Sequence, residues 1–263
     1  MKIATWNING IKARHDNVIA WLREAQPDIV CLQEIKSVDE AFPRSEIEAL
    51  GYNVETHGQK GFNGVALLSK LPFDEVNRGL PLLDGDAEDE QARFIEGAFT
   101  VGDGPLRVAG IYLPNGNPVD SAKFPYKLSW MRRLEAWARA RLELEEPLII
   151  LGDYNVIPEP VDCHDPRAWE GDALFRPESR SAFRALCHLG FSEAVRAATA
   201  ASEVYTFWDF QAGAWQKNNG IRIDHMLLSP EAADRLAAVS IDKHTRSWEK
   251  PSDHVPVWLD YAA

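Results

Sequence analysis

The 263-residue chain is poor in cysteine and lacks any long apolar run. Three cysteines are too few for a disulfide framework, which excludes a small disulfide-stabilised scaffold and favours a reducing compartment. No uncharged apolar segment approaches the roughly 18–20 residues that cross a bilayer, and the opening MKIATWNING contains no secretory apolar region. The sequence therefore predicts a cytoplasmic protein that does not associate with membranes.

Positive charge is also scarce. Lys and Arg number 28 against 40 Asp and Glu, which gives a net charge of −12. Such an excess repels nucleic acid at long range, so composition alone argues against a DNA-binding protein. The segment Leu83–Gln91 concentrates part of this charge and is predicted to be a solvated acidic loop. Any contact with DNA would then depend on a local basic face.

The chain contains short runs rich in β-branched residues, separated in places by segments with helical periodicity. No repeat, low-complexity stretch or linker interrupts it, so we expect one domain spanning residues 1–263 with mixed α/β architecture. The proline-rich stretch Pro158–Pro177 is predicted to be a long surface loop. The predicted helices are Asn17–Ala25, Lys127–Leu144 and Glu178–Leu189. The predicted strands are Lys2–Trp6, Ile29–Leu32, Val65–Leu68, Ile95–Phe99, Val108–Tyr112, Leu148–Leu151, Ile223–Leu228 and Val255–Leu259.

Polar residues gather at the ends of these predicted strands. In α/β proteins such positions form the cleft in which ligands bind. Taken singly, each residue also has a structural interpretation. Glu34 could pair with Lys36 at the surface, and Asp153 could form a turn with its own backbone. The residues at strand ends are Asn7, Asn9, Glu34, Tyr112, Asn115, Asp153, Asn155, Asp224, Asp253 and His254.

Nine sequence blocks span the chain in a fixed order. They are WNING, LQEIK, HGQKGFNGVALLSK, YLPNGN, KFPYK, GDYNVIP, YTFWDF, GIRIDHMLLS and EKPSDHVPVW. Together they resemble the exonuclease/endonuclease/phosphatase superfamily, and most closely its exonuclease III and apurinic endonuclease branch. The resemblance implies a four-layer α/β sandwich, in which two packed mixed β-sheets are flanked by helices.

The resemblance also implies a chemistry. Hydrolysis of a phosphodiester needs a nucleophilic water, a cation to offset the phosphate charge, and help for the leaving oxygen. Mg²⁺ (or Mn²⁺) prefers oxygen ligands and retains waters, so one or two carboxylates suffice. The family pattern assigns metal binding to Glu34, with Asn7, Asn9 and Asp253 as further candidates. Asn9 stands where some relatives have Asp.

The remaining catalytic roles follow from the same pattern. Asp153 is expected to orient or deprotonate the attacking water, and Asn155 to hold phosphate or water. Asp224 and His254 are expected to form a carboxylate–imidazole pair that favours the imidazolium and stabilises charge on the phosphate. The resemblance places Tyr112 as a hydrogen-bond donor to the phosphate or as an assistant to the leaving group.

The resemblance further implies how a substrate would bind. An apolar pocket for a flipped, baseless sugar would use Phe207, Trp208, Ile221 and Ile223, although these residues could equally belong to the core. Asn115 could reach into a groove or simply form a turn. The candidates for phosphate contacts are Lys60, Lys123, Lys127, Arg222, Lys243, Arg246 and Lys250.

These features predict a divalent-metal-dependent DNA repair nuclease that acts as a monomer on double-stranded DNA. We expect it to cut 5′ to abasic sites and to degrade DNA from 3′ ends, including blocked ends, with possible 3′-phosphatase activity. The alternative is a lipid or inositol phosphodiesterase or phosphatase of the same superfamily. A third possibility is a catalytically inactive binding module, which would be expected to have a broken set of catalytic residues.

Overall fold

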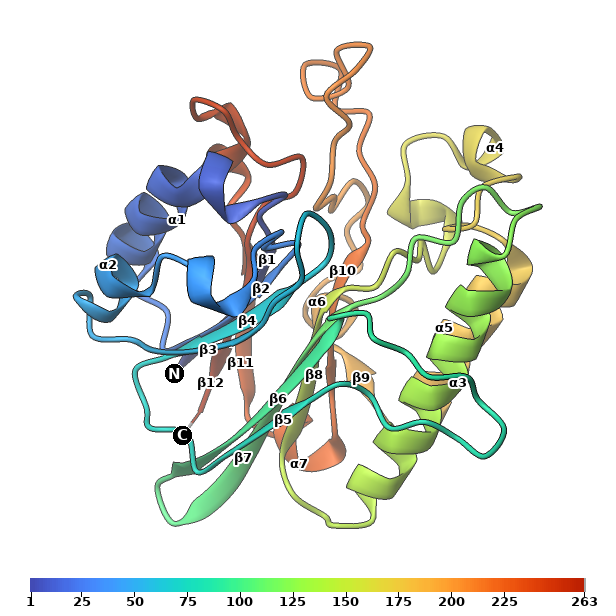
Figure 1. Cartoon of the computed structure of the whole chain (residues 1–263). Coiled ribbons are helices and arrows are strands. Elements are labelled where there is room, and N and C mark those ends of the chain that lie inside the picture. Colours follow the sequence, from blue (N-terminus) through green and yellow to red (C-terminus); the bar gives the residue numbers. More distant parts are fainter. Residues whose placement is uncertain (263) are drawn as a thin grey trace.

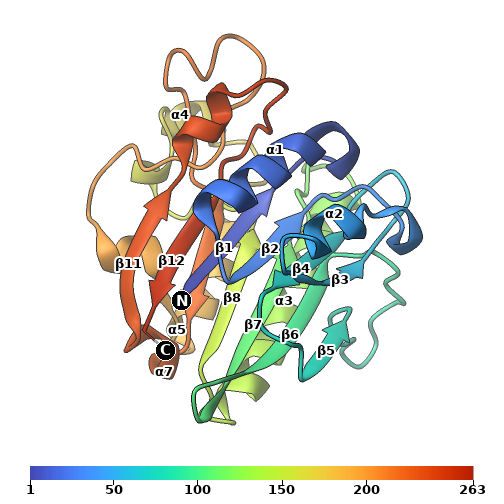
Figure 2. The same ribbon diagram turned by 90° about the vertical axis from the view of Figure 1, so that its left-hand side faces the viewer.

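The computed structural model describes residues 1–262, in which twelve strands form two six-stranded sheets. Helices α1 (Ile11–Ala25) and α2 (Arg44–Glu48) cover the outer face of the first sheet, whereas α3 (Lys123–Leu142) and α5 (Pro177–His188) cover that of the second (Figure 1). Figure 2 looks onto the first sheet, with α1 and α2 in front of it. This arrangement is the expected four-layer α/β sandwich, so the predicted fold is confirmed.

Each sheet is mixed, because it combines one parallel strand pair with antiparallel pairs. β1 runs parallel to β2 in the first sheet, and β7 runs parallel to β8 in the second. The first sheet comprises, in order, β11 (Leu236–Ile241), β12 (Val257–Tyr261), β1 (Lys2–Asn7), β2 (Ile29–Gln33), β4 (Val65–Ser69) and β3 (Asn53–His57). The second comprises β5 (Glu75–Arg78), β6 (Phe94–Val101), β7 (Gly104–Tyr112), β8 (Leu148–Asp153), β10 (Asp224–Leu228) and β9 (Ser192–Glu193).

The central strands are apolar on both faces because both faces are covered. In β1, Ile3 packs into the core between the sheets, while Ala4 and Trp6 face α1. The sheets approach closely at Gly110, where a Cβ atom would lie only 2.0 Å from Sγ of Cys31. Glycine is therefore required at this position for the two sheets to pack.

The predicted helices are present, but their bounds differ. α1 begins at Ile11, six residues before the predicted start, because the polar residues of its first turns obscure the apolar period. α3 begins at Lys123 and ends at Leu142, whereas α5 matches its prediction to within one residue at each end. The shorter helices are α4 (Pro166–Trp169), α6 (Ala194–Ala198) and α7 (Pro230–Ala233). No helix among residues 1–262 combines the length and apolarity needed to cross a membrane.

Four strands were not predicted, namely β3, β5, β9 and β11. All four lie at sheet edges. β3, β5 and β9 lack a continuous apolar run, whereas β11, with the sequence LAAVSI, carries one but is partly exposed. The acidic segment Leu83–Gln91 is largely exposed, as predicted. The carboxylate of Asp89 is almost fully buried, where it pairs with Arg133 at 2.6 Å and accepts a hydrogen bond from Tyr126. Part of the acidic segment is therefore anchored to α3 and is not freely solvated.

Candidate active site

The predicted site residues converge at one end of the stacked sheets. Asn7 ends β1, Glu34 follows β2, Tyr112 ends β7 and Asp153 ends β8, so the two parallel strand pairs deliver their carboxyl ends to one place. The cleft between them has a volume of about 320 Å³. Its lining residues are Glu34, Tyr112, Asn115, Asn117, Asp153, Asn155, Trp169, Asp172, Leu174, Phe207, Asp209, Ile221, Ile223, Asp253 and His254.

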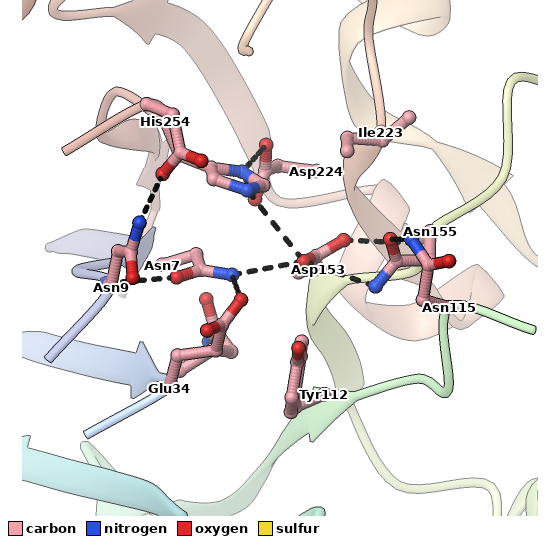
Figure 3. Close-up of polar contacts among 12 residues, drawn as sticks. Asn7, Asn9, Glu34, Tyr112, Asn115, Asp153, Asn155, Ile223, Asp224 and His254 are labelled. Carbon is pink, nitrogen blue, oxygen red and sulfur yellow. Dashed lines mark hydrogen bonds and ion pairs between the residues drawn. The ribbon is translucent and has the colours of Figure 1, made fainter. Parts of the chain in front are cut away.

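Asn7 joins the two sheets at the floor of this cleft. Its Nδ2 donates to Oε1 of Glu34 and to Oδ2 of Asp153, each at 2.9 Å, while its Oδ1 accepts the backbone N–H of Asn9 (Figure 3). Because Asn7 is fully buried, its bond to Asp153 is shielded from water. One amide therefore fixes the separation of two carboxylates that come from different sheets.

Glu34 is an ionised carboxylate that is partly open to the cleft. Its backbone adopts a left-handed conformation with φ of 51°, which is uncommon for a non-glycine residue and is often found at functional sites. Burial alone would raise its pKa, but the Asn7 hydrogen bond and the Lys36 ammonium 2.9 Å away outweigh burial and hold the pKa below its usual value. This environment suits a ligand for a cation.

Asp153 is buried among hydrogen-bond donors. Besides Asn7, the backbone N–H of Asn155 donates to its Oδ1 at 2.8 Å, and the Asn155 side chain donates to Oδ2 at 3.2 Å. Burial raises the pKa of Asp153 above its usual range, an effect that the positive charge of His254 partly offsets. A carboxylate with a raised pKa can accept a proton near neutral pH.

His254 and Asp224 form the expected buried pair. Nδ1 of His254 lies 2.9 Å from Oδ2 of Asp224, and its Nε2 lies 3.8 Å from Oδ2 of Asp153 (Figure 3). Burial would lower the pKa of His254, but the carboxylates of Asp224 and Asp153 outweigh it and raise the pKa. The imidazole is therefore held in its charged form.

Thr206 completes this pair and was not identified from the sequence. Its Oγ1 donates to Oδ2 of Asp224 at 2.6 Å and accepts the backbone N–H groups of Ile223 and Asp224. The hydroxyl thus fixes the carboxylate that orients the histidine. Thr206 lies in the YTFWDF block, where the neighbouring aromatic residues carry the more conspicuous signal.

Tyr112 projects into the cleft beside Glu34. Burial, together with the carboxylates of Glu34 and Asp153, raises its pKa well above the usual value, so the phenol retains its proton. Arg93 covers one face of the ring at 4.7 Å and donates to the Tyr112 carbonyl at 3.1 Å. Tyr112 is thus a fixed hydrogen-bond donor.

Asn9 and Asp253 lie at the rim and contact each other. Asn9 donates its Nδ2 to Oδ1 of Asp253 at 3.1 Å, and its Oδ1 accepts from Lys36 at 2.6 Å. Both polar atoms of the Asn9 amide are therefore engaged, and its lysine partner is the one that pairs with Glu34. Its assignment as a metal ligand stays a prediction that this geometry does not favour.

The donor set of the cleft fits a hard divalent cation. Within residues 1–262 no three His, Cys, Asp or Glu side chains cluster as a metal cage. The cleft is nevertheless lined by five carboxylates, from Glu34, Asp153, Asp172, Asp209 and Asp253, against the single positive charge of His254. Mg²⁺ is commonly held by one or two carboxylates and several waters. Glu34 is the residue best placed to hold it.

Three of the four residues predicted to form an apolar pocket do line the cleft. Phe207, Ile221 and Ile223 line the cleft, and Phe207 also packs edge-on against His254 with ring centres 4.9 Å apart. Trp208 does not line it, because the residue after Phe207 points the other way and is buried against Tyr205 and Trp215. Trp169 and Leu174, from the segment predicted as a surface loop, take its place.

Three of the predicted phosphate contacts are wrong. Arg222 is buried in the segment just before β10, where it pairs with Asp162 and Glu193 at 2.9 Å. Lys127 is fully buried, and Arg246 is almost so. These side chains cannot reach DNA on the surface. Lys123 is exposed beside a small polar pocket that it shares with Asn115, which is also exposed, and Arg93. Lys60 and Lys250 are exposed as well, and Lys243 is half-buried.

Comparison with known proteins identifies the family of this chain. The model of the endonuclease/exonuclease/phosphatase family matches residues 4–254. Exodeoxyribonuclease III from Haemophilus influenzae is 36% identical over 269 aligned positions, which cover 99% of this chain and 100% of that protein. The chain belongs to the endonuclease/exonuclease/phosphatase family. The predicted family and enzyme class are thereby confirmed, and the family is divalent-metal-dependent.

Further relatives include both bacterial and animal nucleases. The DNA repair nuclease APEX1 from Danio rerio is 30% identical and covers 98% of this chain, which in turn covers 81% of it. Among solved structures, an AP endonuclease from Archaeoglobus fulgidus superposes with a TM-score of 0.93 at 35% identity and full coverage of both chains. The 3′ phosphatase NExo from Neisseria, bound to a product DNA hairpin, superposes equally well, at 36% identity and 99% coverage of each chain.

Proposed function

We propose that this enzyme hydrolyses phosphodiester and phosphomonoester bonds in duplex DNA, cutting 5′ to abasic sites and acting at 3′ ends, with Mg²⁺ or Mn²⁺. The observation that carries the proposal is the bridge of Asn7 between Glu34 and Asp153, beside the His254–Asp224 pair. Around one cleft, Glu34 can bind a cation, Asp153 can accept a proton and His254 supplies a buried positive charge. The named activities of the relatives supply the substrate class.

Asp153 is the proposed acceptor of the proton from the attacking water. Its raised pKa matches this task near neutral pH, and its hydrogen bonds to Asn7 and Asn155 fix the carboxylate. The water oxygen forms a bond to phosphorus while its proton passes to Asp153. The bond from phosphorus to the 3′ oxygen then breaks.

His254 and Tyr112 are proposed to stabilise the negative charge that develops on the phosphate. With Nδ1 bonded to Asp224, the imidazolium presents Nε2 toward Asp153 and the cleft, where it stabilises negative charge on a phosphate oxygen. Tyr112 keeps its proton and can donate to the phosphate or to the leaving 3′ oxygen. A divalent cation held by Glu34 would supply Lewis-acid stabilisation of the same charge when bound.

The wall of Phe207, Ile221 and Ile223 supports selection of a sugar without a base. These side chains, with Trp169 and Leu174, form an apolar surface directly beside the catalytic carboxylate. A compact apolar site accepts a deoxyribose or a frayed 3′ end and excludes a stacked base by size. We expect the protein to act as a monomer, because every proposed catalytic group comes from one chain.

The test compares matched oligonucleotide duplexes. One carries a single abasic analogue, one a recessed 3′ hydroxyl and one a 3′ phosphate, each incubated with Mg²⁺, with Mn²⁺ and with EDTA. We expect metal-dependent incision 5′ to the abasic analogue and release of nucleotides or phosphate from the 3′ ends. Absence of metal-dependent cleavage from all three would overturn the proposal, and faster hydrolysis of an inositol phosphate would favour the alternative substrate class.

A further inference from the structure

Lys127, the second lysine of the KFPYK block, lies directly beneath the active site. Its side chain is fully buried on α3, and its Nζ donates to the carbonyl of Asn155 at 2.5 Å and to that of Asn115 at 3.1 Å. These carbonyls belong to two separate loops, which follow β8 and β7. No carboxylate in the described chain forms an ion pair with this ammonium. A buried lysine held only by two carbonyls is unusual, because burial of an unpaired charge is costly.

The two residues that Lys127 holds are also joined to each other above it. Nδ2 of Asn115 donates to Oδ1 of Asn155 at 3.1 Å, and Nδ2 of Asn155 donates to the Leu113 carbonyl and to Asp153. Figure 3 shows Asn115, Asn155 and Asp153 side by side. Lys127, Asn115 and Asn155 are therefore linked in a ring of hydrogen bonds that joins the two loops. The Asn155 amide extends this network to Asp153, the carboxylate proposed to accept the proton.

The loop after β7 is shaped to wrap around the lysine stem. Gly116 follows Asn115 with φ of 89°, and a Cβ atom there would lie 2.7 Å from Cδ of Lys127. A side chain at this position would both strain the backbone and displace the lysine. Stem and loop are thus built to fit each other.

The two hydrogen bonds from Lys127 to the loop carbonyls do not require a permanent positive charge on its amine. Burial lowers the pKa of Lys127 to about 7, against the opposing pull of Asp153 on β8 and Asp172 on the loop before α5. A neutral amine still has two N–H groups, one for each carbonyl. The bridge between the loops therefore persists in either protonation state.

We propose that Lys127 is a positioning residue, whose buried amine ties the Asn115 loop to the Asn155 loop and so aligns both amides with Asp153. This inference rests on the proposed nuclease function. It assigns a role in alignment to a lysine that the sequence alone placed among the DNA contacts. Loss of the amine is expected to reduce turnover and to leave DNA binding largely intact.

The test replaces Lys127 by methionine, which matches its length but has no N–H group. We expect kcat on the abasic duplex to fall by roughly 100-fold, while KM changes by less than about 3-fold. Lys70→Met is the matched control. Lys70 also donates its Nζ to a backbone carbonyl, that of Gln26 at 2.9 Å, but at the end of the first sheet away from the active site. The control should keep full activity.

A double-mutant cycle separates positioning from general stability. If Lys127 acts through Asn155, Lys127→Met should cost little further activity in an Asn155→Ala background. Equal losses in the two backgrounds, or wild-type kcat in the single variant, would overturn the inference. If Lys127→Met does not fold, Lys127→Gln replaces it in the same comparison, because its amide nitrogen ends one bond short of the Nζ position and cannot bridge both carbonyls. A wild-type enzyme without nuclease activity would instead overturn the proposed function.

Discussion

Nδ1 of His254 lies 2.9 Å from Oδ2 of Asp224, and both side chains are buried. The carboxylate is held in turn by the hydroxyl of Thr206 at 2.6 Å. With Nδ1 committed to Asp224, the Nε2 atom of the imidazole faces Asp153 across 3.8 Å. A positive charge is thereby fixed beside the carboxylate that we propose as proton acceptor.

Removal of that charge should be costly. Asp224→Asn keeps the side-chain size but removes the negative charge that favours the imidazolium of His254. We expect kcat on an abasic duplex to fall by roughly 100- to 1000-fold, the scale of losing a preorganised electrostatic contact. Thr206→Val, which loses only the orienting hydroxyl, should lose less. Steady-state kinetics of both variants checks the order, and a larger loss in Thr206→Val would contradict it.

Asn7 should matter as the bridge between the two sheets. Asn7→Ala leaves Glu34 and Asp153 without the donor that they share, so their separation is no longer fixed and their mutual repulsion is less well compensated. We expect kcat to fall by about 100-fold. Asn17→Ala is the control, because Asn17 donates its amide to the carbonyls of Glu249 and Lys250 on the surface. Comparable losses in the two variants would argue against a bridging role.

Glu34 should govern the requirement for metal. Glu34→Gln preserves shape but removes the ionised carboxylate that Asn7 and Lys36 stabilise. We expect the concentration of Mg²⁺ that gives half-maximal activity to rise by at least about 10-fold. A titration of activity against Mg²⁺ measures this value. An unchanged half-maximal concentration would remove Glu34 from the metal site.

Apolar runs and helical periodicity predicted a mixed α/β fold, whereas the four layers and the roles of the cleft residues were implied by the resemblance to the family. The central strands are buried on both faces and therefore carry unmistakable apolar runs, and polar residues such as Asp153 stand out where those runs end. Edge strands such as β5 carry no such signal. The orientation of Arg222, Trp208 and Lys127 could not be predicted either. Arg222 and Trp208 lie outside the helices and strands, and the direction of Lys127 depends on how α3 packs against the loops of the site.

Arg222 thus stabilises the fold through its ion pair with Glu193. This contribution should be lost at low pH. Burial alone would raise the pKa of Glu193, but the guanidinium of Arg222 outweighs it and lowers the pKa to about 2 from an ordinary 4.5. A carboxyl whose pKa is depressed by folding stabilises the fold above its unfolded pKa. That stabilisation, roughly 3 kcal/mol, should be lost as the pH falls from about 4.5 to about 2.

The measurement is the free energy of unfolding by urea between pH 7 and pH 2. In Glu193→Gln the glutamine cannot titrate, so we expect a smaller decline over the acid range than in wild type. The difference between the two proteins should emerge only below about pH 4.5. Parallel curves over the whole range would show that Glu193 is not coupled to folding.

The most direct test of the account is the cleavage of an abasic duplex by wild type and by Asp153→Asn, with saturating Mg²⁺ and with EDTA. Asparagine keeps the size of the side chain but cannot accept the proton of the attacking water. We expect wild type to incise only with metal, and the variant to bind the duplex with similar affinity while its cleavage rate falls by at least about 1000-fold. Undiminished incision by Asp153→Asn would contradict the central claim that this carboxylate drives the reaction.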